Sequence, residues 1–313
     1  MATLSIPNPV PSAIEDAEKL RKAFQGWGTD EKAMIAVLAH RDAAQRKQIK
    51  IAYEEQYKEK LLKRIESEIS GHFERAVYRW IFDPVERQAI MANIAIKNKV
   101  VDFPVIIEIA CINSSNELLA VKQVYQSLYK HSLEEDVASH ATGDFRKLLF
   151  ALVGTYRYDG EEINTELAKT EAKILNDAIT KGEYNSDEII RILSTRSKAQ
   201  LQATFNCYKD AHNLSITKAL STKTPNDFVI ALRAAIRCRT TPTKYFEKVL
   251  RNILQKSGMD EDALTRVIVM HAEKDLKEIK ELFQTRANMT LEQAVAKKTS
   301  GDYENFLLAL IGN

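Results

Sequence analysis

The feature that most constrains the fold of this 313-residue chain is a pattern that occurs four times along it. In each copy a short polar segment ends in an aromatic residue that begins an apolar stretch. These aromatic residues are Phe73, Phe145, Phe228 and Tyr303, in steps of 72, 83 and 75 residues. A second landmark precedes each one, at Arg41, Asn113, Arg196 and His271, with the same three steps. Two landmarks that share unequal steps indicate four copies of one structural unit.

The apolar stretches predict helices that pack into small bundles. Phe73, Val77 and Trp80 recur at the spacing of one helix face, and the other copies follow the same period. Ser132 with Glu135, and Thr290 with Gln293, have the spacing of helix capping boxes. The chain has only ten glycines and seven prolines, which favours helices over a strand-rich fold. A repeat of about 70 residues holds four or five helices, so we expect an all-α protein built from four bundles.

The repeat register also predicts domain boundaries. The longer middle step indicates a polar connector at 156–162 between the second and third copies. We expect the following segments: an N-terminal arm at 1–13, repeat 1 at 14–84, repeat 2 at 85–156, repeat 3 with its preceding linker at 157–238, and repeat 4 at 239–313.

Charge and composition exclude several classes of function. The 45 basic and 43 acidic residues are interspersed and give a net charge of +2, which argues against nucleic acid as a partner. No apolar run approaches the roughly 18 residues of a membrane-spanning helix, and the N-terminus lacks a leader pattern. The three cysteines, Cys111, Cys207 and Cys238, have no zinc-ligand spacing and fit a reducing compartment. A cytoplasmic location is therefore expected.

A glycine-containing segment in repeat 1 is the best candidate for a metal-binding site. Gly26 and Gly28 stand at alternate positions between two predicted helices. Glycine readily takes positive φ, so such a loop can turn successive carbonyl oxygens toward one point. A ring of oxygens suits Ca²⁺, which takes six to eight oxygen ligands, usually with a carboxylate among them. The loop would then need an acidic partner from elsewhere in the chain.

The loop Gly26-Trp27-Gly28-Thr29, the repeat register and the aromatic landmarks resemble annexins over essentially the whole chain. The proline-rich start and the segment Asp83-Pro84-x-Glu86-Arg87 resemble plant annexins in particular. The resemblance implies an all-α fold of four repeats of about five helices each, arranged as a slightly curved disc. It also implies calcium-dependent binding to anionic phospholipid membranes by a cytoplasmic protein that becomes peripheral when calcium rises.

The resemblance further implies a set of site residues. The family pairs its loop with an acidic residue three positions before the glycine of the aromatic landmark, which here is Glu68. The implied Ca²⁺ ligands are the carbonyls of Phe24, Gly26 and Gly28 and the carboxylate of Glu68, with Thr29 and Glu31 as a weaker neighbouring site. Trp27 would contact the membrane from the loop tip. The alternative is that the glycines only separate two helices and that Trp27 folds back on its own bundle.

The other repeats depart from this pattern. At the position of Glu68 they have His140, Lys223 and Lys298, respectively. Repeat 4 keeps a Gly258 loop, but Lys256 replaces its first glycine. Because a lysine ammonium repels a cation, we expect one principal calcium site, in repeat 1. Whether the Gly258 loop retains residual calcium binding is left open.

Two other functions can be derived from plant annexins. A redox or peroxidase-like stress protein would use His40, Cys111 and Cys238, although a structural histidine and buried thiols are the ordinary interpretation. We therefore expect no enzyme. An actin-binding scaffold would use Ile190-Arg191-Ile192, whose isoleucines also fit a core stripe. Finally, Gln88 and Asn113 replace a charged pair of the family, so ion conduction is not expected to carry over.

Overall fold

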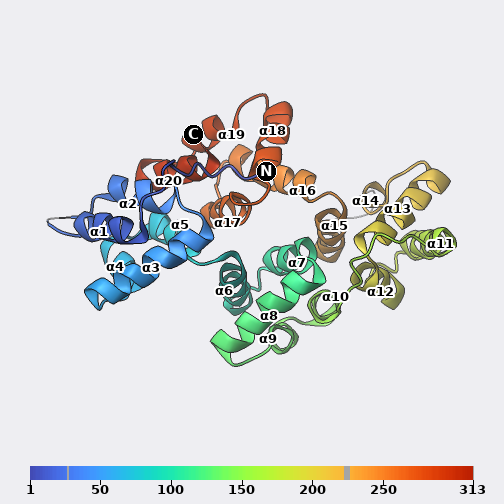
Figure 1. The fold of residues 1–313 in the computed structure, drawn as a ribbon. Coiled ribbons are helices and arrows are strands. Elements are labelled where there is room, and N and C mark those ends of the chain that lie inside the picture. Colours follow the sequence, from blue (N-terminus) through green and yellow to red (C-terminus); the bar gives the residue numbers. More distant parts are fainter. Residues whose placement is uncertain (27, 222–225, 313) are drawn as a thin grey trace. The chain divides into compact units, whose positions relative to one another are not determined.

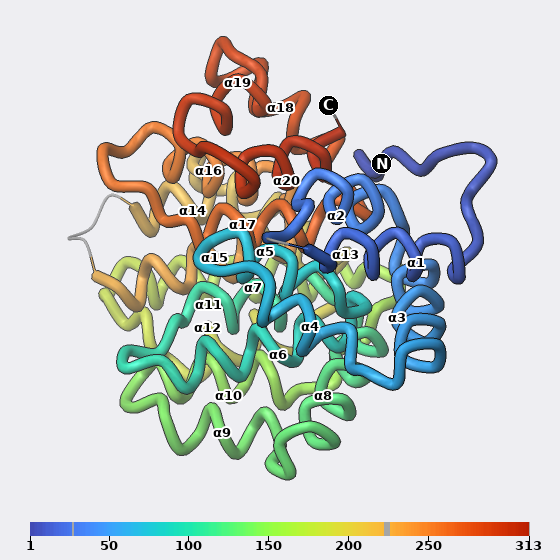
Figure 2. Tube along the Cα trace, turned by 90° about the vertical axis from the view of Figure 1, so that its left-hand side faces the viewer, coloured from blue at the N-terminus to red at the C-terminus, as the bar shows by residue number. Residues whose placement is uncertain are grey.

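In the computed structural model, residues 1–26, 28–221 and 226–312 are described, and every regular element among them is a helix. Trp27 and Lys223, both named above, lie outside the described residues. The chain can be followed through its helices in Figures 1 and 2. The prediction of an all-α protein with about five helices in each repeat is confirmed for the described residues.

The first two repeats contain ten helices. Those of repeat 1 are α1 (Ala13–Ala23), α2 (Glu31–Leu38), α3 (Ala43–Tyr57), α4 (Leu61–Glu68) and α5 (Gly71–Ile81). Those of repeat 2 are α6 (Pro84–Lys97), α7 (Phe103–Ile112), α8 (Ser115–Tyr129), α9 (Leu133–His140) and α10 (Gly143–Gly154).

The last two repeats contain the other ten described helices. Those of repeat 3 are α11 (Thr165–Lys181), α12 (Asp187–Thr195), α13 (Lys198–His212), α14 (Ile216–Ala219) and α15 (Asp227–Thr240). Those of repeat 4 are α16 (Pro242–Gln255), α17 (Glu261–His271), α18 (Leu276–Ala287), α19 (Leu291–Ala296) and α20 (Gly301–Ile311).

Local sequence explains where many of these helices begin and end. The two capping boxes predicted at Ser132 and Thr290 are both present, at the starts of α9 and α19. The third helix of every repeat ends in a left-handed residue, at Lys58, Lys130, Asn213 and Asn288. These four positions follow the same steps as the sequence landmarks, so the duplication extends to backbone conformation.

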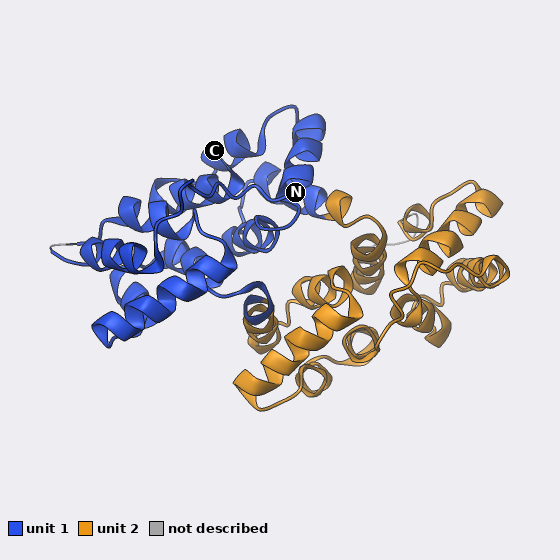
Figure 3. Ribbon diagram, in the orientation of Figure 1, with its two compact units in different colours: residues 1–87, 246–313 blue, residues 88–245 orange. Residues whose placement is uncertain are grey.

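The chain divides into two compact units, coloured separately in Figure 3. One comprises residues 1–87 and 246–313, and the other comprises residues 88–245, so the boundaries fall inside α6 and α16. In the first unit, α5 packs on α17 and α20, and α2 also contacts α20. In the second, α7 packs on α15 and α10 contacts α12. Repeats 1 and 4 thus share one core, and repeats 2 and 3 share another.

Each repeat makes one contact at equivalent positions, and the chemistry of this contact differs among the repeats. The contact joins a residue of the first helix to the landmark residue that follows or ends the second helix. The pairs are Asp16 with Arg41, Gln88 with Asn113, Glu171 with Arg196, and Phe246 with His271. Two are ion pairs, one is a neutral hydrogen bond of 2.6 Å, and one is a ring contact at 4.0 Å. The expectation that Gln88 and Asn113 form an uncharged pair is therefore confirmed.

The N-terminal arm packs on helices of repeat 4. The Thr3 hydroxyl donates to the carbonyl of Leu310 at 2.6 Å, and the Thr3 amide donates to that of Ala272 at 2.9 Å. The first residues of the chain are thereby held within the same unit as repeat 1. Among the described helices, none has the length and apolar character that crossing a membrane would require.

Candidate functional site

The loop between α1 and α2 is held at both of its ends. Phe24 caps α1, and its ring is buried against Tyr53, with 6.2 Å between ring centroids. At the other end the Asp30 amide donates to the Ala23 carbonyl at 2.9 Å, and the Asp30 carboxylate accepts from the Ala33 amide. Core packing of Phe24 and the N-cap of α2 thus fix the two ends of the loop.

The two loop glycines adopt the conformation predicted from their spacing. Gly26 has φ of 109° and Gly28 has φ of 93°, both in the region that residues with a side chain rarely enter. A β carbon would meet no other atom at either position, so the requirement for glycine comes from the backbone and not from crowding. Trp27, between them, lies outside the described residues.

Glu68 reaches this loop from α4. The Thr29 hydroxyl donates to Glu68 Oε2 at 2.5 Å and also lies 3.2 Å from the Glu68 carbonyl oxygen. The Glu68 side chain is 15% exposed, so its carboxylate is largely shielded from water. The structure thus brings together two of the residues that the sequence pattern related over about forty positions.

Arg64, which the sequence analysis did not single out, lies between the remaining oxygens. Its Nη2 atom is 2.6 Å from Glu68 Oε1 and 2.6 Å from the carbonyl oxygen of Phe24. One nitrogen therefore contacts two of the oxygens proposed as metal ligands. The spacing of Arg64 and Glu68, four residues apart on a helix, could have indicated the ion pair. The contact with Phe24 required knowledge of how α1 and α4 pack.

This arrangement fits a cation. A carboxylate oxygen and a backbone carbonyl oxygen converge on one positively charged group, and a threonine hydroxyl stands at the other carboxylate oxygen. Oxygen donors of these kinds are those that calcium prefers. Among the described residues no cluster of three or more histidine, cysteine, aspartate or glutamate side chains is suited to a metal. A calcium site here would therefore rely on backbone carbonyls.

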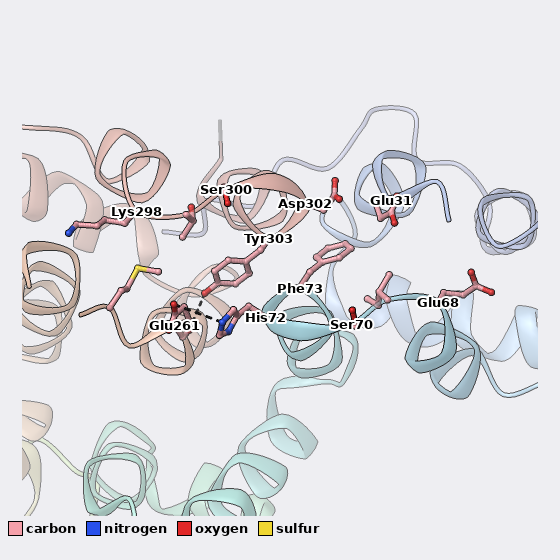
Figure 4. Close-up of a pocket in the computed structure, with 13 residues that line it drawn as sticks. Glu31, Glu68, Ser70, His72, Phe73, Glu261, Lys298, Ser300, Asp302 and Tyr303 are labelled. Carbon is pink, nitrogen blue, oxygen red and sulfur yellow. Dashed lines mark hydrogen bonds and ion pairs between the residues drawn. The ribbon is translucent and has the colours of Figure 1, made fainter. Parts of the chain in front are cut away.

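Glu68 and Glu31 also line an open pocket of about 440 Å³ formed by repeats 1 and 4. Figure 4 shows these two acidic side chains toward one end and Lys298 at the opposite end. Between them, Tyr303 donates to the Glu261 carbonyl at 3.0 Å, and His72 Nε2 lies 3.9 Å from Glu261 Oε1. Glu31, the second acidic residue expected at the site, therefore shares a surface with Glu68.

The loop of repeat 4 holds a lysine where repeat 1 has its carboxylate. Lys298 Nζ donates to the carbonyl oxygen of Lys256 at 3.0 Å. By the repeat register, Lys256 corresponds to Gly26 and Lys298 to Glu68. In repeat 2, Lys97 Nζ lies 3.4 Å from both Asp136 Oδ1 and His140 Nε2. The corresponding residue of repeat 3, Lys223, lies outside the described residues.

The residues considered for redox activity are a hydrogen-bonded histidine and two buried cysteines. His40 Nδ1 lies 2.8 Å from the carbonyl oxygen of Ser5 in the N-terminal arm. Cys111 and Cys238 are buried free thiols, and burial raises the pKa of both. A raised pKa disfavours the reactive thiolate.

The tripeptide considered for actin lies on α12. Ile190 and Ile192 are buried, which leaves Arg191 as its accessible side chain. Arg191 is itself paired with Glu188 at 2.7 Å.

Comparisons with known proteins agree with the fourfold architecture. A family model described as annexin matches residues 15–80, 87–152, 170–235 and 245–310. The annexin-like protein RJ4 of Fragaria ananassa is 60% identical over 312 residues, covering 100% of this chain and 99% of the relative. The structure of annexin III aligns with a TM-score of 0.92 at 31% identity, covering 100% of this chain and 97% of that one. Calcium-bound annexin (Sm)1 aligns with a TM-score of 0.84 at 27% identity, covering 100% and 93%.

Proposed function

Since this chain belongs to the annexin family and is of the plant type, we propose that it binds anionic phospholipid membranes through a calcium site in repeat 1. Annexins in general bind phospholipids in a calcium-dependent way and are mainly non-enzymatic. The observation that supports the proposal for this chain is the convergence of the Glu68 carboxylate and the Phe24 carbonyl on one cation, beside a loop with two positive-φ glycines.

The proposed ligands are the carbonyl oxygens of Phe24, Gly26 and Gly28 and the carboxylate of Glu68. Thr29 and Glu31 would form the weaker neighbouring site. A calcium ion held by so few protein oxygens keeps coordination positions for phosphate oxygens of a lipid. Membrane and protein then each raise the apparent calcium affinity of the other, as thermodynamic linkage requires. With one full carboxylate, the affinity in the absence of lipid should be weak, about 10⁻⁴–10⁻³ M.

Trp27 is proposed to contact the headgroup region once calcium has docked the loop. Its indole combines an apolar ring with an N–H donor, a combination that favours the membrane interface. The second tryptophan provides a clear contrast. Trp80 is fully buried, its Nε1 donates to the Leu38 carbonyl at 2.7 Å, and the guanidinium of Arg46 lies over its ring at 3.9 Å. A change in tryptophan fluorescence on membrane binding should therefore come from Trp27.

The test is sedimentation with anionic vesicles across a calcium titration. Glu68→Gln keeps the size of the side chain but removes its charge, and it should abolish most calcium-dependent binding. Glu66→Gln is the matched control, because Glu66 is exposed on the same helix and loses the same charge. Wild type and control should both show a blue shift of tryptophan fluorescence with vesicles and calcium together.

Unchanged sedimentation of Glu68→Gln would contradict the repeat 1 site. Equal losses in Glu66→Gln and Glu68→Gln would assign the effect to net charge instead. Wild-type sedimentation without calcium dependence would contradict the proposed function itself.

Actin binding and redox activity are less well supported. The buried isoleucines of the tripeptide at 190–192 present little surface to a filament, and the raised pKa of both buried thiols opposes thiolate chemistry. Membrane binding through repeat 1 is therefore the function that the geometry supports best.

A further inference from the structure

We propose that Arg64 is a built-in competitor for calcium at the repeat 1 loop, and that it sets the calcium concentration at which the protein responds. This inference rests on the proposed function. The guanidinium holds the Phe24 carbonyl and the Glu68 carboxylate, and it must leave before both oxygens can coordinate an ion.

The positive charge of Arg64 lies between two oxygens that would both coordinate a calcium ion at the proposed site. A single nitrogen, Nη2, lies 2.6 Å from each of the two oxygens. This terminal nitrogen carries two protons, so it can donate one to each oxygen at the same time. The contact therefore uses two of the acceptors that the proposed site offers to calcium.

The ion pair of Arg64 and Glu68 is strong enough to compete with calcium, and it is exposed enough to solvent to break. Hydrogen bonds between a guanidinium and a carboxylate are among the stronger ones in proteins, especially when water is partly excluded. The Glu68 side chain is 15% exposed and the Arg64 side chain is 29% exposed. Both groups are thus partly shielded, while the guanidinium retains a route to solvent.

A second acceptor is already in place for the displaced guanidinium. Arg64 Nη1 lies 3.9 Å from Glu59 Oε1. The other oxygen of Glu59 is held by Arg21 Nη1 at 2.7 Å and by the Tyr53 hydroxyl at 3.2 Å. Glu59 is therefore fixed with one oxygen facing Arg64. A guanidinium that leaves the loop oxygens can therefore move onto a carboxylate oxygen that already faces it.

In repeat 4 a lysine side chain contacts a carbonyl oxygen of the corresponding loop and also replaces the carboxylate. There the ammonium of Lys298 donates to the carbonyl of Lys256, and no carboxylate stands at the position of Glu68. In repeat 1 the competing cation comes from a neighbouring position on α4, so the carboxylate is retained. Repeat 1 therefore combines a calcium ligand set with a cation that opposes occupancy.

The magnitude follows from the population of the open arrangement. If Arg64 occupies the loop oxygens about nine-tenths of the time, the apparent dissociation constant for calcium rises about tenfold. Arg64→Gln should therefore tighten calcium binding about five- to tenfold. Lys63→Gln is the matched control, because Lys63 is exposed on the same helix and loses the same positive charge.

The experiment is a calcium titration of the full chain by calorimetry without lipid, repeated as sedimentation with anionic vesicles. Arg64→Gln should shift both midpoints to lower calcium, and Lys63→Gln should leave them near the wild-type values. Glu59→Gln removes the negative charge of the alternative acceptor and should shift the midpoints to higher calcium, but only while Arg64 is present. Circular dichroism in the presence of a chelator establishes that each variant is folded before titration. Arg64→Lys serves as a second variant, which loses the two-oxygen contact of the guanidinium but keeps the positive charge.

The outcomes separate this inference from the proposed function. Calcium-dependent binding that is lost in Glu68→Gln but unchanged or weakened in Arg64→Gln and Arg64→Lys would overturn the role of Arg64 alone. Equal shifts in Arg64→Gln and Lys63→Gln would also overturn it, since a general charge effect would then suffice. Absence of calcium binding in wild type and in both Arg64 variants would overturn the site and this inference together.

Discussion

The buried ion pair of repeat 1 allows a quantitative test of how the repeats diverged. Arg41 Nε and Nη2 contact the two oxygens of Asp16 at 2.6 and 2.8 Å, and the two side chains are 3% and 1% exposed. Repeat 2 replaces this pair with Gln88 and Asn113, which share a hydrogen bond of 2.6 Å. Asp16→Gln alone would leave the Arg41 cation buried without its partner.

Breaking a buried ion pair by removing one partner costs about 3–5 kcal/mol. In a unit of about 150 residues each kcal/mol lowers the melting temperature by about 2–4 °C. Asp16→Gln should therefore lower it by about 10 °C. The double variant Asp16→Gln with Arg41→Asn buries no charge and copies the repeat 2 pair, so it should recover at least half of that loss.

The assay is thermal unfolding by circular dichroism of wild type, both single variants and the double variant, without calcium. The four midpoints form a double-mutant cycle, from which the coupling between the two residues is obtained. A loss of about 1 kcal/mol or less in Asp16→Gln would refute the assignment of a strong buried pair. A double variant no more stable than the single one would refute the idea that the repeat 2 solution can replace the ion pair.

Two further predictions concern repeat 4 and the thiols. The double change Lys298→Glu and Lys256→Gly removes the ammonium that contacts the loop carbonyl and supplies a carboxylate. Calorimetry of this variant should show a second calcium site. An unchanged stoichiometry of calcium binding would contradict this account. Because burial raises the pKa of Cys238 above its ordinary value of about 9, its contribution to stability is complete below that pH and is lost as pH rises through the folded-state pKa. The melting temperature of Cys238→Ala should therefore fall less steeply above pH 9 than that of wild type, and equal slopes in a pH series would contradict the shift.

Several parts of the proposed site were accessible from sequence because they depend on local rules. Alternate glycines predict a loop with positive φ, and Gly26 and Gly28 adopt it. The resemblance to annexins, and not a local rule, related Glu68 to this loop, and the structure shows the side chains of Glu68 and Thr29 in contact. The functional assignment of these residues stays a prediction, since it depends on an ion and a membrane.

Arg64 illustrates what local rules could not reveal. Its relation to Glu68 depends on helix geometry alone, but its contact with the Phe24 carbonyl depends on the C-terminal end of α1 lying within reach of a side chain on α4. Sequence spacing does not report which backbone carbonyl a long side chain can reach.

The sequence by itself determined the all-α fold, the fourfold register and the helix caps at Ser132 and Thr290, because periodicity and capping act over a few residues. Only the tertiary structure decided which partner each polar side chain takes. Equivalent positions became an ion pair at Asp16 and Arg41, a neutral hydrogen bond at Gln88 and Asn113, and a ring contact at Phe246 and His271. The physical reason is that a buried polar group must find a partner wherever the packing of distant helices offers one.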